Sequence, residues 1–126
     1  RQASAEPTDF DRFVARMNAL PKLVASSTLP RQAELPWNAS VIDGDVVERV
    51  AEVKQQHNLL KYGDGPLGAT LARHNLIDEY HLFLTPVAIG TGKHHLFADI
   101  DWAPQLKLLD LTRFANGVVV LVYAPK

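Results

Sequence analysis

The spacing of hydrophobic residues changes along the chain, and it predicts helices and strands in alternation. Three segments have one apolar face at helical spacing: the stretch between Thr8 and Pro21, residues 46–56 and residues 66–74. Short β-prone runs lie between and after them, at 22–25, 39–42, 59–62 and 79–85. Strands that alternate with helices are typical of an α/β fold with a mostly parallel sheet.

Two longer β-prone runs close the chain, at 106–114 and 118–123. Ala115-Asn116-Gly117 separates them, and Asn-Gly between β-prone runs is the strongest short hairpin signal. The pattern therefore predicts a C-terminal antiparallel hairpin added to the parallel sheet.

The segment from Leu59 to Thr85 reads as strand, glycine turn, helix and strand. Gly63 and Gly65 allow backbone conformations that side chains prevent, and Pro66 suits the first helical position. Free amides at such a helix start favour a phosphate group, so the turn is either an anion site or plain turn geometry. Asp64 counts against phosphate unless its carboxylate points away or caps the helix.

Three hydroxyl residues, Ser26, Ser27 and Thr28, follow the first predicted strand. In open α/β sheets the C-terminal ends of parallel strands form the ligand-binding edge. Hydroxyl groups there donate to phosphate or ribose, or they serve ordinary turn chemistry; both alternatives stay open at this point.

The first predicted helix carries an apolar face made of Phe10, Phe13, Val14 and Met17. A packing helix is the first interpretation of this face, and a lid over a ligand is the second.

The composition suits a soluble globular protein of one domain, residues 1–126. A net charge of −1 without a large basic block argues against nucleic acid and anionic membranes as partners. The chain has no cysteine, which excludes thiolate metal sites and cysteine nucleophiles and suits a cytoplasmic setting. No run is long enough to span a bilayer.

Histidines and carboxylates do not form a recognisable metal motif. A metal site could be built from His81, His94, His95 and Asp99. Adjacent histidines, however, rarely both reach one metal, and the sequence has no HExxH pair. Asp78 and Glu79 are neighbours on a predicted strand, where they point to opposite faces. We therefore expect no metal site and no paired-carboxylate acid/base site.

Several motifs together resemble the dihydrofolate reductase-like family, and most closely the C-terminal reductase domain of bacterial riboflavin biosynthesis deaminase-reductases. They occur in the family's order over nearly the whole chain: Met17-Asn18-Ala19-Leu20-Pro21-Lys22, Ser26-Ser27-Thr28-Leu29, Trp37-Asn38, Tyr62-Gly63-Asp64-Gly65-Pro66-Leu67, Leu76-Ile77-Asp78-Glu79-Tyr80-His81-Leu82, Thr85-Pro86-Val87, Gly90-Thr91-Gly92-Lys93, and Phe114-Ala115-Asn116-Gly117-Val118-Val119 with Tyr123. The resemblance implies a three-layer α/β/α dihydrofolate reductase-like fold and descent from NADPH-dependent reductases.

The resemblance also implies a cofactor site in two segments. The family's pyrophosphate turn corresponds to Gly63, Asp64, Gly65, Pro66 and Leu67, and its adenosine ribose and 2′-phosphate segment to Ser26, Ser27, Thr28 and Leu29. Close relatives commonly carry arginine where this chain has Ser27, so NADH is not excluded beside NADPH. The same relatives carry a small polar residue where this chain has Asp64.

Family members begin with a central strand, a substrate loop and a first helix, and none of these precedes Arg1. We therefore expect an N-terminally truncated fold that lacks much of the substrate pocket, no identifiable catalytic residue, and a homodimer that covers exposed strand edges. The leading functional interpretation is hydride transfer from NADPH to a pterin- or pyrimidine-like heterocycle. The alternative is a non-catalytic nucleotide-binding or assembly module that keeps the fold.

Overall fold

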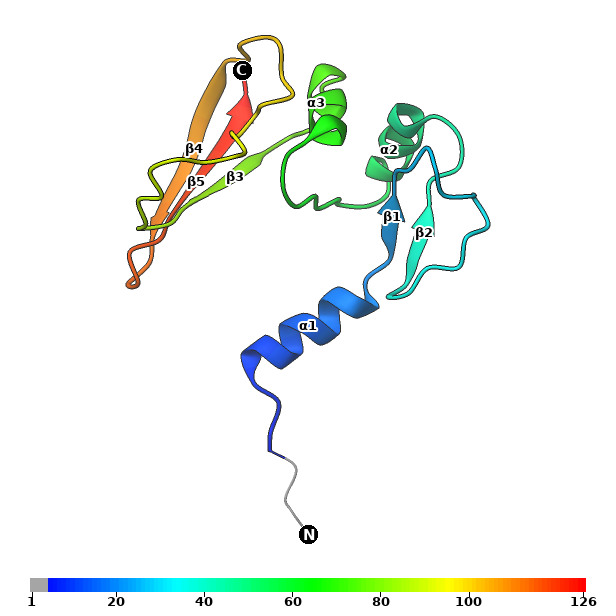
Figure 1. Cartoon of the computed structure of the whole chain (residues 1–126), viewed down its shortest axis with the longest axis horizontal. Helices are drawn as coiled ribbons and strands as arrows, with labels where there is room; N and C mark the ends of the chain where they lie inside the picture. The colour runs from blue at the N-terminus through cyan, green and yellow to red at the C-terminus, as the bar shows by residue number, and fades with distance from the viewer. Residues whose placement is uncertain (1–4) are drawn as a thin grey trace. The chain divides into compact units, whose positions relative to one another are not determined.

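The computed structural model describes residues 5–126, and these residues form two compact units, with the division of the chain between Arg49 and Val50 (Figure 1). The elements in chain order are α1 (Asp9–Ala19), β1 (Lys22–Val24), β2 (Ala39–Val41), α2 (Val46–Lys54), α3 (Pro66–Arg73), β3 (Tyr80–Leu84), β4 (Leu106–Arg113) and β5 (Val119–Pro125).

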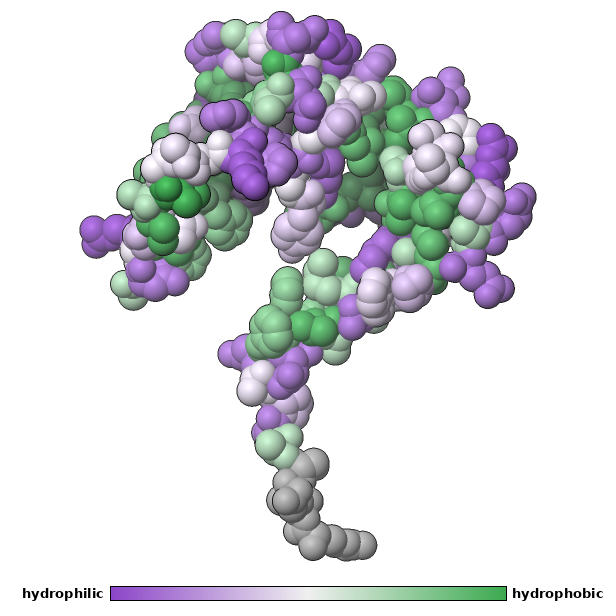
Figure 2. Space-filling model, in the orientation of Figure 1, coloured by the Kyte–Doolittle hydropathy of each residue, from purple (hydrophilic) through white to green (hydrophobic). Residues whose placement is uncertain are grey.

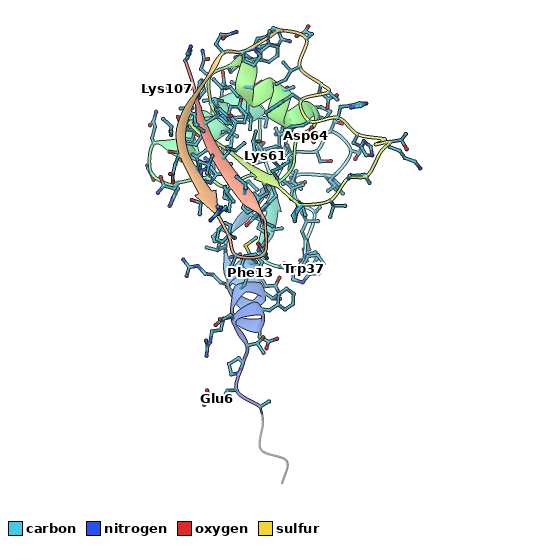
Figure 3. The ribbon with its side chains drawn as sticks, turned by 90° about the vertical axis from the view of Figure 1, so that its left-hand side faces the viewer. Glu6, Phe13, Trp37, Lys61, Asp64 and Lys107 are labelled. Atoms are coloured by element: carbon cyan, nitrogen blue, oxygen red, sulfur yellow. The ribbon has the colours of Figure 1, made fainter. Side chains whose placement is uncertain are left out.

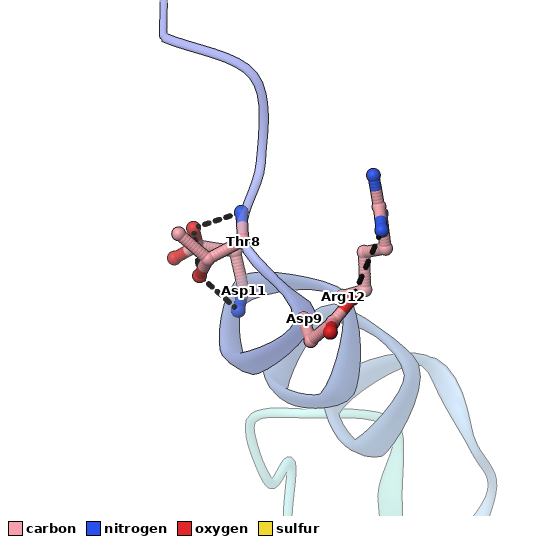
Figure 4. A network of polar contacts seen from close by, with 4 residues as sticks. All are labelled: Thr8, Asp9, Asp11 and Arg12. Atoms are coloured by element: carbon pink, nitrogen blue, oxygen red, sulfur yellow. Dashed lines mark hydrogen bonds and ion pairs between the residues drawn. The ribbon is translucent and has the colours of Figure 1, made fainter.

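Helix α1 opens the first unit with a capping box (Figure 4). The Thr8 hydroxyl accepts a hydrogen bond from the Asp11 amide at 3.1 Å, and the Asp11 carboxylate accepts one from the Thr8 amide at 2.8 Å. These bonds satisfy two amides that a helix start leaves without partners. The helix ends at Ala19, where Leu20 is already extended ahead of Pro21, as the sequence predicts.

The apolar face of α1 stays exposed. Phe10 and Phe13 keep 72% and 54% of their surface accessible, and none of the helix's residues is buried. Figure 2 shows this face as green apolar surface on the helix. Among the described residues of the first unit, no element covers this face, so the expected packing of α1 is not found there.

Strands β1 and β2 pair in parallel and form the small sheet of the first unit. Their register places Lys22 opposite Ala39 and Val24 opposite Val41, and Val41 is buried. The Asn38 side chain donates to the carbonyl oxygen of Ala19 at 2.9 Å, which ties the loop before β2 to the end of α1. Both predicted strands are confirmed.

The second unit contains an antiparallel sheet in the order β3-β5-β4. Strands β4 and β5 are joined at Asn116-Gly117, where Gly117 has φ +90° and the Asn116 side chain accepts from the Val118 amide at 3.1 Å. The hairpin prediction is confirmed. Val120 on β5, Leu71 on α3 and Val50 on α2 are the buried apolar residues of the described part of this unit.

The strand predicted at 59–62 is wrong. The structure has no strand there, and Leu60 and Tyr62 keep 74% and 65% of their surface exposed. A β-strand needs a hydrogen-bonded neighbour, and none of the described strands pairs with this segment. The β-prone composition of the segment is real, but composition alone does not supply a partner.

The α/β fold class is confirmed, with a parallel part before the C-terminal antiparallel hairpin. That residues 1–126 form one domain, and that the protein is a homodimer, stay predictions. Within residues 5–126, every helix is too short or too polar to cross a membrane.

Candidate functional site

The glycine turn before α3 leaves backbone amides without intrahelical partners at a helix start. Gly63 has φ +72°, and Gly65 occupies the N-cap position with φ +120° and ψ −172°, a conformation essentially limited to glycine. No side chain caps the helix, and Pro66 brings no amide hydrogen. The amides of Leu67 and Gly68 therefore lie at a helix start where intrahelical acceptors do not exist.

A positive charge stands beside this turn. The Lys61 ammonium donates to the carbonyl oxygen of Gly63 at 2.8 Å. Its Nζ also lies 3.4 Å from the place where a Cβ on Gly68 would be, so it covers the first turn of α3 (Figure 3). Gly68, without a Cβ, leaves room for the Lys61 side chain.

Asp64 does not cap α3 with its side chain. Its Oδ2 accepts a hydrogen bond from the backbone amide of Phe97 at 3.1 Å. The carboxylate therefore connects the glycine turn to a segment 33 positions further along the chain. The Asp64 side chain is exposed and bonds to Phe97, so of the two orientations that phosphate binding would tolerate it does not adopt the helix cap.

We call residues 97–102 the strap. Phe97 lies edge-on to the Tyr80 ring of β3, with ring centroids 5.5 Å apart, and partial burial raises the pKa of the Tyr80 phenol. At the other end, the Arg73 guanidinium donates to the Asp101 carboxylate and lies 4.6 Å above the Trp102 ring. The hydrogen bond from Arg73 and its charge lower the pKa of Asp101. The strap is thus attached near both ends of α3.

The hydroxyl segment of the first unit is a compact turn held by its own side chains. The Ser26 hydroxyl accepts from the amides of Thr28 and Leu29 at 3.2 and 3.1 Å, and lies 3.3 Å from the Thr28 hydroxyl. Ser27 is exposed and makes no side-chain hydrogen bond within residues 5–126. The segment offers neutral hydroxyl groups and no cation.

Among the histidines and carboxylates singled out in the sequence, His81, Asp78 and Glu79 have ordinary partners. His81 bonds to Glu79 at 2.8 Å, and Asp78 pairs with Lys54 at 2.8 Å. The two adjacent acids thus face different groups, as their positions predict. Across residues 5–126, no three histidine or carboxylate side chains come together as metal ligands would.

The structure brings the predicted residues together within each unit. Gly63 to Leu67 form one continuous turn and helix start, and Ser26 to Leu29 form one hydrogen-bonded turn. Sequence reasoning missed Lys61, Phe97 and Arg73. Lys61 carried a usable signal, a cation two positions before the first glycine, whereas the other two depend on contacts distant in sequence.

Comparison with protein families gives one match over nearly the whole chain: residues 3–120 match the RibD C-terminal domain. The uncharacterized protein YyaP of Bacillus subtilis (strain 168) is 33% identical over 94 residues, which are 73% of this chain. The chain spans about half the length of that curated relative, since the match covers 50% of it.

Three solved structures share the fold. A Shewanella sp. PV-4 protein named for riboflavin biosynthesis superposes with a TM-score of 0.63 at 19% identity, covering 84% of this chain and 60% of that one. RibD of Acinetobacter baumannii superposes with a TM-score of 0.56 at 17% identity, covering 82% of this chain and 36% of that one. A pyrimidine reductase-like protein of Corynebacterium diphtheriae superposes with a TM-score of 0.52 at 17% identity, covering 70% of this chain and 38% of that one. At these identities the likeness establishes a common fold.

The family match covers more than nine-tenths of the chain, and it includes both the hydroxyl turn and the glycine turn. The fold of the two units agrees with the same assignment. This chain belongs to the RibD C-terminal domain family.

Proposed function

We propose that this chain is the cofactor-binding part of an NADPH-dependent reductase that acts on a pterin- or pyrimidine-like heterocycle. The observation that carries the proposal is the glycine turn within a RibD C-terminal domain match: an uncapped helix start with a lysine ammonium beside it. When bound, NADPH supplies a hydride from its nicotinamide ring.

The glycine turn fits a pyrophosphate group in three respects. Gly65 adopts a conformation that keeps side-chain atoms out of the turn, and no heavy atom lies within 4 Å of where its Cβ would stand. The α3 amides and the helix dipole favour a negative group. The Lys61 ammonium adds a full positive charge at the same place.

The hydroxyl turn fits a less charged part of the cofactor. Ser27 and Thr28 present hydroxyl groups that hydrogen-bond to ribose or to a phosphate oxygen. Because these four residues include no cation, we propose that Ser26 to Leu29 bind the adenosine ribose and discriminate only weakly between NADPH and NADH.

Cofactor titration tests the proposal. We expect nicotinamide fluorescence to change on addition of the protein to NADPH, with saturation, and a smaller preference over NADH than relatives with arginine would have. Absence of any change up to about 1 mM, the upper end of ordinary KM values, would remove the cofactor from the proposal. The Gly65→Val variant serves as the matched negative control.

A further inference from the structure

Two polar contacts join the strap to the α3 region, one near each end of the helix. Asp64 lies two positions before Pro66, the first residue of α3, and it accepts from Phe97 at the start of the strap. Arg73 is the last residue of α3, and it pairs with Asp101 near the end of the strap. Both attachments lie within the second unit, so they fasten the strap to the helix that follows the glycine turn.

Phe97 indicates that the first attachment is built rather than incidental. Its φ is +62°, a left-handed conformation that residues other than glycine seldom adopt and that costs on the order of 1 kcal/mol. Such conformations persist where several contacts act together to hold them. Here the contacts include the hydrogen bond to Asp64, the edge-on packing against Tyr80 and the Ile100 amide, which donates to the Phe97 carbonyl oxygen at 3.1 Å.

The loop directly before the strap, residues 90–96, carries Lys93, His94 and His95. His95 is two residues from Phe97, so its Cα lies within about 7 Å of the Phe97 Cα. Fixing Phe97 to the glycine turn therefore fixes the end of this loop near the same turn. Gly90, with φ +77°, and Gly92 leave the remainder of the loop free to change conformation.

We propose that Asp64 is a positioning residue: its carboxylate latches the strap, and through it loop 90–96, beside the glycine turn. The latch explains how an acid is tolerated in an anion-binding turn, because the carboxylate is engaged by the Phe97 amide. The statement that the loop borders a cofactor rests on the proposed function. The latch between Asp64 and Phe97 does not depend on it.

Limited trypsin digestion tests the latch without any cofactor, because Lys93 is a cleavage site inside the loop. Cleavage in a native protein follows the population of the locally open state. We expect Asp64→Ala to speed cleavage after Lys93 about fivefold, the effect of losing one charge-assisted hydrogen bond at an exposed site. Cleavage after Arg31, in the first unit, is the internal reference.

Two further variants test whether the effect comes from the Asp64–Phe97 hydrogen bond. One removes the charge of Asp64 but keeps its acceptor oxygen, and the other removes a different carboxylate of the strap. Asp64→Asn keeps an acceptor oxygen for the Phe97 amide, so cleavage after Lys93 should stay close to the wild-type rate. Asp99→Ala removes an exposed carboxylate from the strap without touching the latch and should also leave the rate unchanged. Unchanged cleavage in Asp64→Ala, or equal acceleration at Arg31, would overturn the latch.

NADPH titration of the same variants then separates the two proposals. Both variants lose a negative charge beside the proposed phosphate site, but only Asp64→Asn keeps an acceptor for the Phe97 amide. With the latch and the cofactor site both correct, Asp64→Asn binds NADPH more tightly than the wild type, and Asp64→Ala binds it less tightly than Asp64→Asn. If cleavage responds as expected and no variant binds NADPH, the latch stands and the proposed function falls. If cleavage responds and Asp64→Ala binds NADPH as tightly as Asp64→Asn, the positioning role falls.

Discussion

The two predicted cofactor segments hold themselves in different ways. The turn at Ser26 to Leu29 is closed by its own side chain, since the Ser26 hydroxyl accepts from two following amides. The turn at Gly63 to Leu67 is shaped by glycine backbone conformations and by contacts from elsewhere: Lys61 on one side and Phe97 on the other. The first segment is neutral, whereas the second carries a cation and an engaged acid.

This difference indicates how each segment should respond to change. A turn that is closed by its own side chain should tolerate substitution at its exposed position, Ser27. Such a substitution should change the preference between NADPH and NADH without loss of structure. A turn that depends on a glycine-only conformation fails when that conformation is denied. We therefore expect the glycine turn to determine whether a cofactor binds at all, and the hydroxyl turn to determine which one.

The largest effect should come from Gly65→Val. The position requires φ +120° and ψ −172°, which a β-branched residue adopts only at a cost of about 1–3 kcal/mol. We expect NADPH affinity to fall by at least about tenfold while the fold is mostly retained, as each 1.4 kcal/mol is a factor of ten. Fluorescence titration measures the affinity, and circular dichroism follows the fold.

Ala115→Val is the control for that prediction. Ala115 is exposed in the turn between β4 and β5, and it is not among the residues with a positive φ. The NADPH affinity of this variant should equal that of the wild type. Unaltered affinity in Gly65→Val would show that the pyrophosphate is held elsewhere.

Lys61→Met should have the next largest effect. Methionine keeps an unbranched side chain but removes the ammonium group beside the glycine turn. Losing one partly screened charge contact with a phosphate should weaken NADPH binding about fivefold and make it less sensitive to salt. Lys107→Met, on strand β4, is the control and should change neither (Figure 3).

How far the sequence predicted this site depends on the range of the interactions. The glycine turn and the Asn-Gly hairpin were predictable because the few residues involved determine their own backbone conformations. The contact between Asp64 and Phe97 was not, because it joins positions 33 apart. The strand at 59–62 was predicted from β-prone residues, yet pairing depends on a neighbour that local composition does not encode.

Ser27→Arg addresses the other side of the comparison, with a moderate effect. An exposed arginine in the hydroxyl turn adds a charge-assisted bond to a 2′-phosphate, which NADH lacks. We expect the affinity ratio of NADPH to NADH to rise about threefold, as one exposed charge pair contributes, with little change for NADH itself. Ser40→Arg, on strand β2 of the same unit, should leave the ratio unchanged. An equal gain for both cofactors would mean that Ser27 does not face the 2′ position.

The smallest expected effect is a pH response of the strap. Arg73 lowers the pKa of Asp101 below its ordinary 3.8, so the ion pair contributes stability above that value and loses it as the pH falls through the lowered pKa. Because Arg73 also lies 4.6 Å above the Trp102 ring, fluorescence reports the change. In a Trp37→Phe background, we expect constant emission from pH 7 down to about 5 and a transition only below 3.8. Asp101→Asn should abolish that transition; if it persists, another group controls the strap.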